Sequence, residues 1–191
     1  MKQRVIIYAH PYEKSFNQAI CDKVVETLAE QKKSYQLIDL YRDNFNPAYT
    51  KKELELFASG KTTDVLVEKY QQAILAAEKL IFIFPVWWND LPAIVKGFID
   101  KVMKKEFAYE ITNVGIKGKL NNIKEVVVYT TATSPKWYLK FFAGNAIKKV
   151  FLKATIKQIG IKKTRWYHLG KINSISTEKR VDFLNNIKKN I

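Results

Sequence analysis

Residues 79–103, KLIFIFPVWWNDLPAIVKGFIDKVM, place an apolar run, a turn with two tryptophans and an amphipathic segment in direct succession. The run KLIFIF (79–84) is almost continuously apolar, as is typical of parallel strands covered on both faces. After the turn, apolar residues recur every three or four positions, which predicts a helix with Asp90 as its N-cap and Pro92 in its first turn. The stretch therefore predicts a strand and a helix in sequence, the repeating unit of an α/β fold.

The same alternation extends along the whole chain. Four further apolar runs predict strands: RVIIYA (4–9), SYQLID (34–39), EVVVYT (125–130) and TRWYHL (164–169). Helical patterns lie at 16–30, 63–77, 138–159 and 177–189, and the S-x-x-Q sequence from Ser15 to Gln18 fits a capping box. We expect residues 1–191 to form one α/β domain, a five-stranded parallel sheet of order 2-1-3-4-5 with helices on both faces.

Cysteine and histidine are scarce in the chain. Cys21 is the sole cysteine, so no intramolecular disulfide can form, and a reducing compartment is expected. The N-terminal apolar run is too short for a signal peptide, and no run suffices to span a membrane, so we expect a soluble cytoplasmic protein without stable membrane insertion. His10 and His168 are the only histidines, and no carboxylate cluster accompanies either, so no metal site is expected.

The net charge of +15 is concentrated near the C-terminus, where residues 136–191 hold 14 Lys/Arg and only 2 Asp/Glu. Such a region can meet nucleic acid, an anionic membrane face or an anionic small molecule. The segment KKVFLKATIKQIGIKK (148–163) resembles an amphipathic interfacial helix, so a basic binding module is one alternative. A domain helix with a solvated basic face is the simpler interpretation, and we expect no nucleic-acid partner.

In the expected strand order, ligands bind beyond the carboxyl ends of the strands, at the switch point between the first and third. Three loops converge there: AHPYEKSFN (9–17), PVWWNDLP (85–92) and TTATSPKWY (130–138). The first enters a helix whose free N–H groups can hold an anion, although capping alone also explains Ser15. The second offers two tryptophans that cannot both pack inward, and the third offers hydroxyls on small residues. Together they describe a flavin nucleotide pocket.

Two motifs in these loops resemble a known family. The sequences H-P-x-x-x-S-F-N (10–17) and F-P-x-x-W-x-x-x-P-A-I-x-K-G-x-x-D-K-V (84–102), with T-T at 130–131, resemble the flavodoxin-like NAD(P)H:quinone oxidoreductases. This family includes the modulator-of-drug-activity proteins and the ancillary reductases of potassium efflux systems. The resemblance implies a flavodoxin-like fold, a tightly held FMN or FAD, a homodimer, and ping-pong hydride transfer from NAD(P)H through flavin N5 to a quinone or similar small acceptor.

By position, the resemblance also implies which residues hold the flavin. The residues expected to contact the phosphates and ribityl chain are His10, Ser15, Phe16 and Asn17. Those expected to line the isoalloxazine are Pro85, Val86, Trp87, Trp88 and Asn89, with Trp88 facing the ring. Those expected at the ring edge are Thr130, Thr131, Ala132 and Thr133. Tyr138 matches a tyrosine that stabilises charge on the reduced flavin and is the candidate catalytic residue.

The chain departs from the family pattern at two places. It reads TTAT at 130–133 where quinone reductases usually have T-T-G-G, which adds bulk where the backbone approaches the flavin. Gly144 stands where the animal enzymes have a histidine, so a histidine-assisted proton relay is not expected. Chain length favours FMN, with FAD as the alternative. A flavodoxin that carries single electrons is a further alternative, although such carriers are typically acidic.

Overall fold

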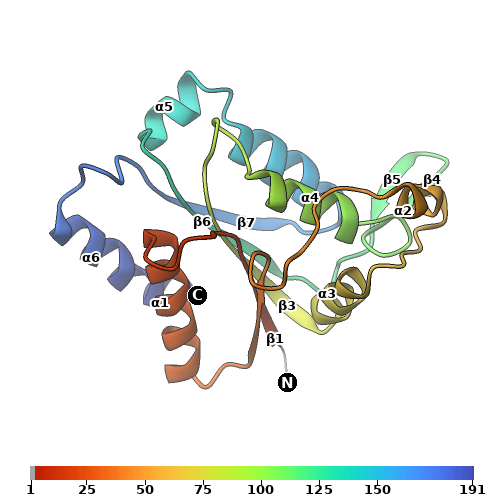
Figure 1. Cartoon of the computed structure of the whole chain (residues 1–191), viewed down its shortest axis with the longest axis horizontal. Helices are drawn as coiled ribbons and strands as arrows, with labels where there is room; N and C mark the ends of the chain where they lie inside the picture. The colour runs from red at the N-terminus through yellow and green to blue at the C-terminus, as the bar shows by residue number, and fades with distance from the viewer. Residues whose placement is uncertain (1–2) are drawn as a thin grey trace.

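A five-stranded parallel sheet forms the centre of the computed structural model, which describes residues 3–191 (Figure 1). Every neighbouring pair of its strands runs parallel. In spatial order the strands are β2 (Tyr35–Asp39), β1 (Gln3–Tyr8), β3 (Ala77–Pro85), β6 (Glu125–Thr131) and β7 (Lys163–Leu169). Counted among themselves, these strands follow the predicted order 2-1-3-4-5, so the flavodoxin-like α/β arrangement is confirmed.

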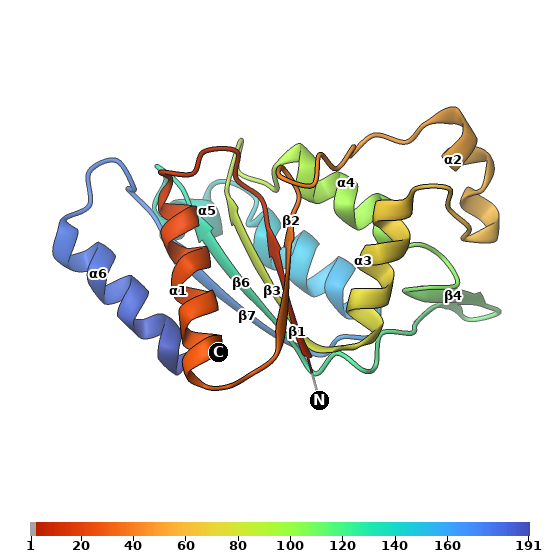
Figure 2. The ribbon, with the colours of Figure 1, turned by 60° about the horizontal axis from the view of Figure 1, so that its bottom comes forward.

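Helices cover both faces of the sheet (Figure 2). One face carries α1 (Phe16–Glu30), α6 (Thr177–Asn185) and the short η3 (Asn186–Lys189). The other carries α3 (Val65–Leu75), α4 (Ala93–Val102) and the π-helical η2 (Ile147–Ile156). Connections between these elements contain α2 (Lys51–Glu55), η1 (Phe57–Ser59) and α5 (Lys136–Phe141).

The strand sequences are apolar because both of their faces are buried. In β1, Val5 and Ile7 belong to the core under α3, α4 and η2, whereas Ile6 and Tyr8 pack beneath α1. Alternate side chains of a strand point to opposite faces, so an unbroken apolar run supplies two cores at once. This explains why the strands are readable as continuous runs in the sequence.

The local structure differs from the sequence analysis at one predicted helix and at one hairpin that was not predicted. The helix predicted over 138–159 is interrupted between α5 and η2, where Gly144 and Asn145 adopt positive φ values of 70° and 56°. Left-handed backbone ends a helix, and glycine and asparagine tolerate it best. The sequence analysis also missed a hairpin of β4 (Tyr109–Thr112) and β5 (Gly115–Gly118), which lies outside the main sheet.

Residues of α4 fix the long connection between β2 and α3. A Cβ added to Gly97 would lie 2.3 Å from Cβ of Pro47, so only glycine allows this approach. Lys101 is 1% exposed, and its Nζ donates to Asp64 Oδ2 at 2.9 Å and to the Asn46 carbonyl at 2.8 Å. Two residues of the second family motif therefore serve to anchor the fold.

The basic segment 148–163 consists of most of the helix η2 and the residues that follow it. Its residues Phe151, Leu152, Ile156 and Ile159 are buried in the core, so they are not available to a membrane surface. Lys148, Lys149, Lys153 and Lys157 remain exposed on the outer side of η2. This matches the domain helix with a basic outer face rather than the interfacial helix. Over residues 3–191, no helix combines the length and apolarity needed to cross a membrane.

Candidate functional site

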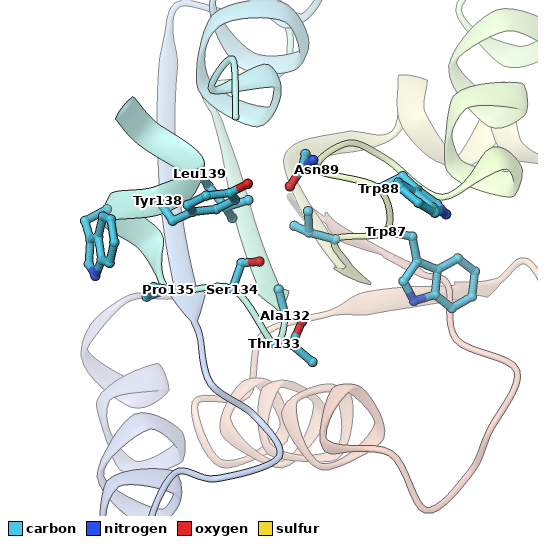
Figure 3. A pocket seen from close by; sticks show the side chains of 11 residues that line it. Trp87, Trp88, Asn89, Ala132, Thr133, Ser134, Pro135, Tyr138 and Leu139 are labelled. Atoms are coloured by element: carbon cyan, nitrogen blue, oxygen red, sulfur yellow. The ribbon is translucent and has the colours of Figure 1, made fainter. Parts of the chain in front are cut away.

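A cleft of about 890 Å³ opens at the carboxyl ends of β3 and β6 (Figure 3). Its floor is formed by Ala132, Thr133 and Ser134, and Tyr138 faces Asn89 across it. Among residues 3–191, no charged side chain lines it; the lining residues are Val86, Trp87, Trp88, Asn89, Ala132, Thr133, Ser134, Pro135, Trp137, Tyr138 and Leu139. Such a surface suits a planar, largely uncharged ring system.

The two tryptophans lie in a tight two-residue turn. The Trp87 N–H donates to the Asp90 carbonyl at 3.2 Å, and the Asp90 N–H donates to the Trp87 carbonyl at 3.0 Å. Between them, Trp88 and Asn89 have φ values of 48° and 66°, the left-handed pair of a type I′ turn. A left-handed conformation is common for asparagine but costly for a bulky residue, so Trp88 is held in a strained position.

The start of α4 differs from the prediction. The helix begins at Ala93 with Pro92 in the N-cap position, so Asp90 is not the N-cap and Pro92 does not lie in the first turn. Asp90 instead accepts a hydrogen bond from the Leu91 N–H through Oδ1, at 2.7 Å. The carboxylate thus supports the exit of the turn rather than the helix.

The rings of the two tryptophans have different surroundings. The Trp87 ring packs edge-on against His10, with centroids 6.2 Å apart. Trp88 is 98% exposed, and its ring extends away from the cleft (Figure 3). The expectation that Trp88 faces the isoalloxazine stays a prediction, and in this structure Trp88 borders the cleft at the turn rather than through its ring.

The loop after β1 is arranged to present donors at the start of α1. His10 Nδ1 accepts from the Tyr12 N–H at 3.0 Å, which leaves the proton of a neutral imidazole on Nε2. Burial lowers the pKa of His10 and favours that neutral form. Ser15 Oγ accepts from the Gln18 N–H at 3.1 Å, which confirms Ser15 as the N-cap. In a full capping box the Gln18 side chain would also bond the Ser15 N–H. Here the Gln18 amide donates to Asp22 instead.

A buried bond joins the first loop to the end of β6. Asn17 Nδ2 donates to Thr131 Oγ1 at 2.8 Å, and both residues are buried. Asn17 Oδ1 is buried without a hydrogen-bond partner in residues 3–191. Buried polar atoms are rarely left unpaired, so this amide is a candidate contact for a bound ligand.

Thr130 does not reach the cleft. Its hydroxyl is buried and accepts from Trp166 Nε1 at 2.8 Å, while His168 Nδ1 lies at 2.8 Å. His168 Nε2 is 3.1 Å from the Ser134 carbonyl, which can only accept, so the imidazole proton lies on Nε2 and Thr130 donates to Nδ1. This chain of hydrogen bonds holds the cleft floor at Ser134.

Tyr138 points into the cleft from α5. Its hydroxyl is directed across the opening toward Asn89 (Figure 3), and its ring stacks on Phe142, with an interplanar angle of 13°. Gly144 has no heavy atom within 4 Å of its hypothetical Cβ, so the position of the family histidine is open space. A phenol hydroxyl is thus available at the cleft without a neighbouring imidazole from residue 144.

The structure brings together most of the site residues expected at the second and third loops. Those lining the cleft are Val86, Trp87, Trp88, Asn89, Ala132, Thr133 and Tyr138. Set back from it are Ser15, Phe16, Asn17, Pro85, Thr130 and Thr131, while His10 lines a neighbouring cavity beside β2. The sequence analysis missed Leu139 and the support from His168, and neither carries a local motif that would have revealed it.

Comparisons with known proteins agree with this architecture. A protein family described as having a flavodoxin-like fold matches residues 2–191. An uncharacterized NAD(P)H oxidoreductase of Haemophilus influenzae is 29% identical over 180 residues, covering 92% of this chain and 87% of that protein. The rat ribosyldihydronicotinamide dehydrogenase (quinone) is 31% identical over 157 residues, covering 73% and 67%.

A solved structure extends the similarity to three dimensions. The NAD(P)H:quinone oxidoreductase from Methanothermobacter marburgensis superimposes with a TM-score of 0.87 at 27% identity, covering 98% of this chain and 94% of that one. The sheet order, the cleft at the carboxyl ends of β3 and β6 and these similarities agree with one another. The chain therefore belongs to the flavodoxin-like fold family, within its group of NAD(P)H:quinone oxidoreductases.

Proposed function

We propose that the protein is a flavin-dependent reductase that binds FMN, takes hydride from NAD(P)H and passes it to a quinone or a similar small acceptor. The observation that carries the proposal is the uncharged cleft at the carboxyl ends of β3 and β6, bordered by main-chain N–H groups without partners. Among the described residues, no hydrogen bond is made by the N–H groups of Trp88, Asn89, Thr133 and Ser134. Such donors suit the carbonyl and nitrogen edge of an isoalloxazine.

The residues near α1 fit the phosphate end of the same cofactor. The first N–H groups of a helix have no partner within it, and at α1 these belong to Phe16 and Asn17. The neutral His10 would offer its Nε2–H from the same loop. The unpaired buried oxygen of Asn17 provides a further polar contact. Phosphate, ribityl chain and ring would thus each meet groups of suitable chemistry along one path.

When bound, a flavin would supply the two-electron hydride chemistry that links NAD(P)H to the acceptor. The chain itself orients the reacting rings and controls charge. Tyr138 would donate its hydroxyl proton in a hydrogen bond to the developing negative charge, together with the loop N–H groups. Ala132 and Thr133 set how closely the backbone approaches the ring. If nicotinamide and acceptor use this one cleft in turn, oxidised nicotinamide must leave before the acceptor enters.

A homodimer is part of this proposal. Two aromatic side chains near the cleft are unusually exposed: Trp88 is 98% exposed, and Phe142, which stacks on Tyr138, is 72% exposed. Large exposed apolar groups gathered at one site mark a surface that another molecule covers. A second copy placed against this rim would close the cleft and exclude water from the hydride transfer.

The test is a steady-state assay of NAD(P)H oxidation with a water-soluble benzoquinone, varying both substrates. Parallel lines in double-reciprocal plots are expected, because product leaves before the second substrate binds. Intersecting lines would contradict the alternating use of one cleft, and failure to oxidise NAD(P)H with added FMN would contradict the reductase assignment.

A further inference from the structure

A second depression lies on the other side of α5 from the cleft. It is a groove of about 700 Å³ between α5, η2 and β7, referred to below as the α5–η2–β7 groove. In the described part of the chain, no acidic residue lines it, and the lysines that do are Lys136, Lys140, Lys148, Lys153 and Lys157. A volume in this range accommodates a nucleotide-sized ligand.

The groove lysines carry uncompensated charge. Within residues 3–191, none of the five makes an ion pair, whereas ten other lysines pair with Asp or Glu and the rest, such as Lys149 and Lys162, do not. Lys136 Nζ donates to the Trp166 carbonyl at 3.0 Å and lies 4.8 Å from the centroid of the Trp166 ring. Burial is the largest cause that lowers the pKa of Lys136, and repulsion from Lys148 and Lys140 lowers it further. A bound anion would relieve this repulsion.

Aromatic rings complete the walls of the groove. Trp137, Phe141 and Trp166 line it together with the lysines. An ion alone needs no aromatic wall, whereas a nucleotide base stacks on one and its phosphates pair with ammonium groups. A second basic cavity, lined by Lys171 and Lys179, has no aromatic residue and so lacks half of this chemistry.

The groove is connected to the cleft in two ways. Trp137 lines both. In addition, the hydrogen bonds from Trp166 through Thr130 and His168 end on the Ser134 carbonyl at the cleft floor. A ligand extending from the cleft over Trp137 would therefore reach the lysines. A ligand that contacts Trp166 would also act, through these hydrogen bonds, on the position of the loop that forms the cleft floor.

We infer that the α5–η2–β7 groove binds the phosphorylated adenosine half of NADPH while the nicotinamide lies in the cleft. This inference rests on the proposed function. NADPH carries one more phosphate than NADH, so a cluster of free lysines discriminates between the two. The adenine would stack against the tryptophans, and the 2′-phosphate and pyrophosphate would pair with the ammonium groups. The enzyme should therefore prefer NADPH.

The experiment titrates 2′,5′-ADP into the purified protein by calorimetry. The groove variant replaces two lysines, Lys140→Gln and Lys148→Gln. The control variant, Lys149→Gln and Lys162→Gln, removes the same charge from exposed positions outside the groove. Loss of charge-assisted hydrogen bonds should raise the Kd of the groove variant about tenfold or more, and that of the control less than twofold. Equal melting temperatures establish that both variants are folded.

Two further measurements separate the possible outcomes. The ratio of kcat/KM for NADPH to that for NADH should fall about tenfold in the groove variant and stay constant in the control. Inorganic pyrophosphate should bind more weakly than 2′,5′-ADP, because it lacks the base. Equal effects of both variants, equal binding of pyrophosphate, or no binding of 2′,5′-ADP would each overturn the inference. The titration needs no turnover, so it decides this inference even if the reductase assignment fails.

Discussion

Replacing the buried lysine of α4, Lys101→Met, should destabilise the fold by about 3–5 kcal/mol. Its ammonium is 1% exposed and faces two carboxylates, Asp64 Oδ2 at 2.9 Å and Glu53 Oε1 at 3.4 Å. Methionine fills a similar volume but leaves both carboxylates near the core without their ion-pair partner. For a chain of this size the loss corresponds to a melting temperature lower by roughly 6–20 °C.

The same argument predicts how the loss depends on pH. Burial alone would raise the pKa of Asp64, but the hydrogen bond and charge of Lys101 outweigh it and hold that pKa below its ordinary value of 3.8. Asp64 therefore contributes stability above that value, and the contribution is lost only as the pH falls through the depressed pKa. In the variant, burial without the Lys101 partner raises the pKa of Asp64, so this carboxyl takes up a proton at higher pH. The difference in unfolding free energy between Lys101→Met and the unsubstituted protein should therefore be smaller at pH 5 than at pH 7.5.

Urea denaturation at these two pH values measures both effects. Lys96→Met is the matched control, because Lys96 lies on the same helix in an exposed i,i+4 pair with Asp100 and should cost no more than about 0.5 kcal/mol. A loss below about 1 kcal/mol for Lys101→Met, or a deficit that is the same at both pH values, would refute the argument from buried charge.

Three further changes test other parts of the structure. Gly97→Ala should lower stability by about 1–3 kcal/mol, read from the same denaturation curves, because its Cβ would lie 2.3 Å from Cβ of Pro47; an unchanged midpoint would show that the connection yields freely. Burial lowers the pKa of His168, so its contribution to stability is complete above the ordinary value of 6.5 and falls as the pH drops below it. The melting temperature should accordingly decline less between pH 7.5 and 5.5 in His168→Gln than in the unsubstituted protein, and equal declines would contradict this. Tyr138→Phe should reduce kcat about tenfold or more while retaining cofactor, and an unchanged kcat would remove Tyr138 from charge stabilisation.

The order of the main sheet could be predicted because its strands are buried on both faces and are punctuated by polar turns. The hairpin at 109–118 could not, because Ile111 and Ile116 are exposed and the strands contribute no continuous core face. The break after α5 was signalled by Gly144 and Asn145, but the apolar periodicity on either side concealed it. Periodicity reports which residues are buried, and it does not report where the backbone turns.

The site was predictable as three loops but not as individual contacts. Parallel topology alone brings the ends of β1, β3 and β6 together, which explains why Trp87, Thr133 and Tyr138 meet as expected. The inward direction of Thr130 depends on hydrogen bonds to Trp166 and His168, which lie 36 and 38 residues further along the chain. Likewise, the Trp88 ring points outward because its backbone lies in a type I′ turn. The sequence W-W-N-D does not predict this turn, since of the two central residues only the asparagine favours positive φ.

An absorption spectrum of the purified protein tests the central claim, that the cleft between β3 and β6 holds a flavin, most directly. The account predicts a yellow protein with visible flavin absorption, and release of FMN on heating, identified by chromatography. A colourless protein whose addition leaves the spectrum of free FMN unchanged would contradict it.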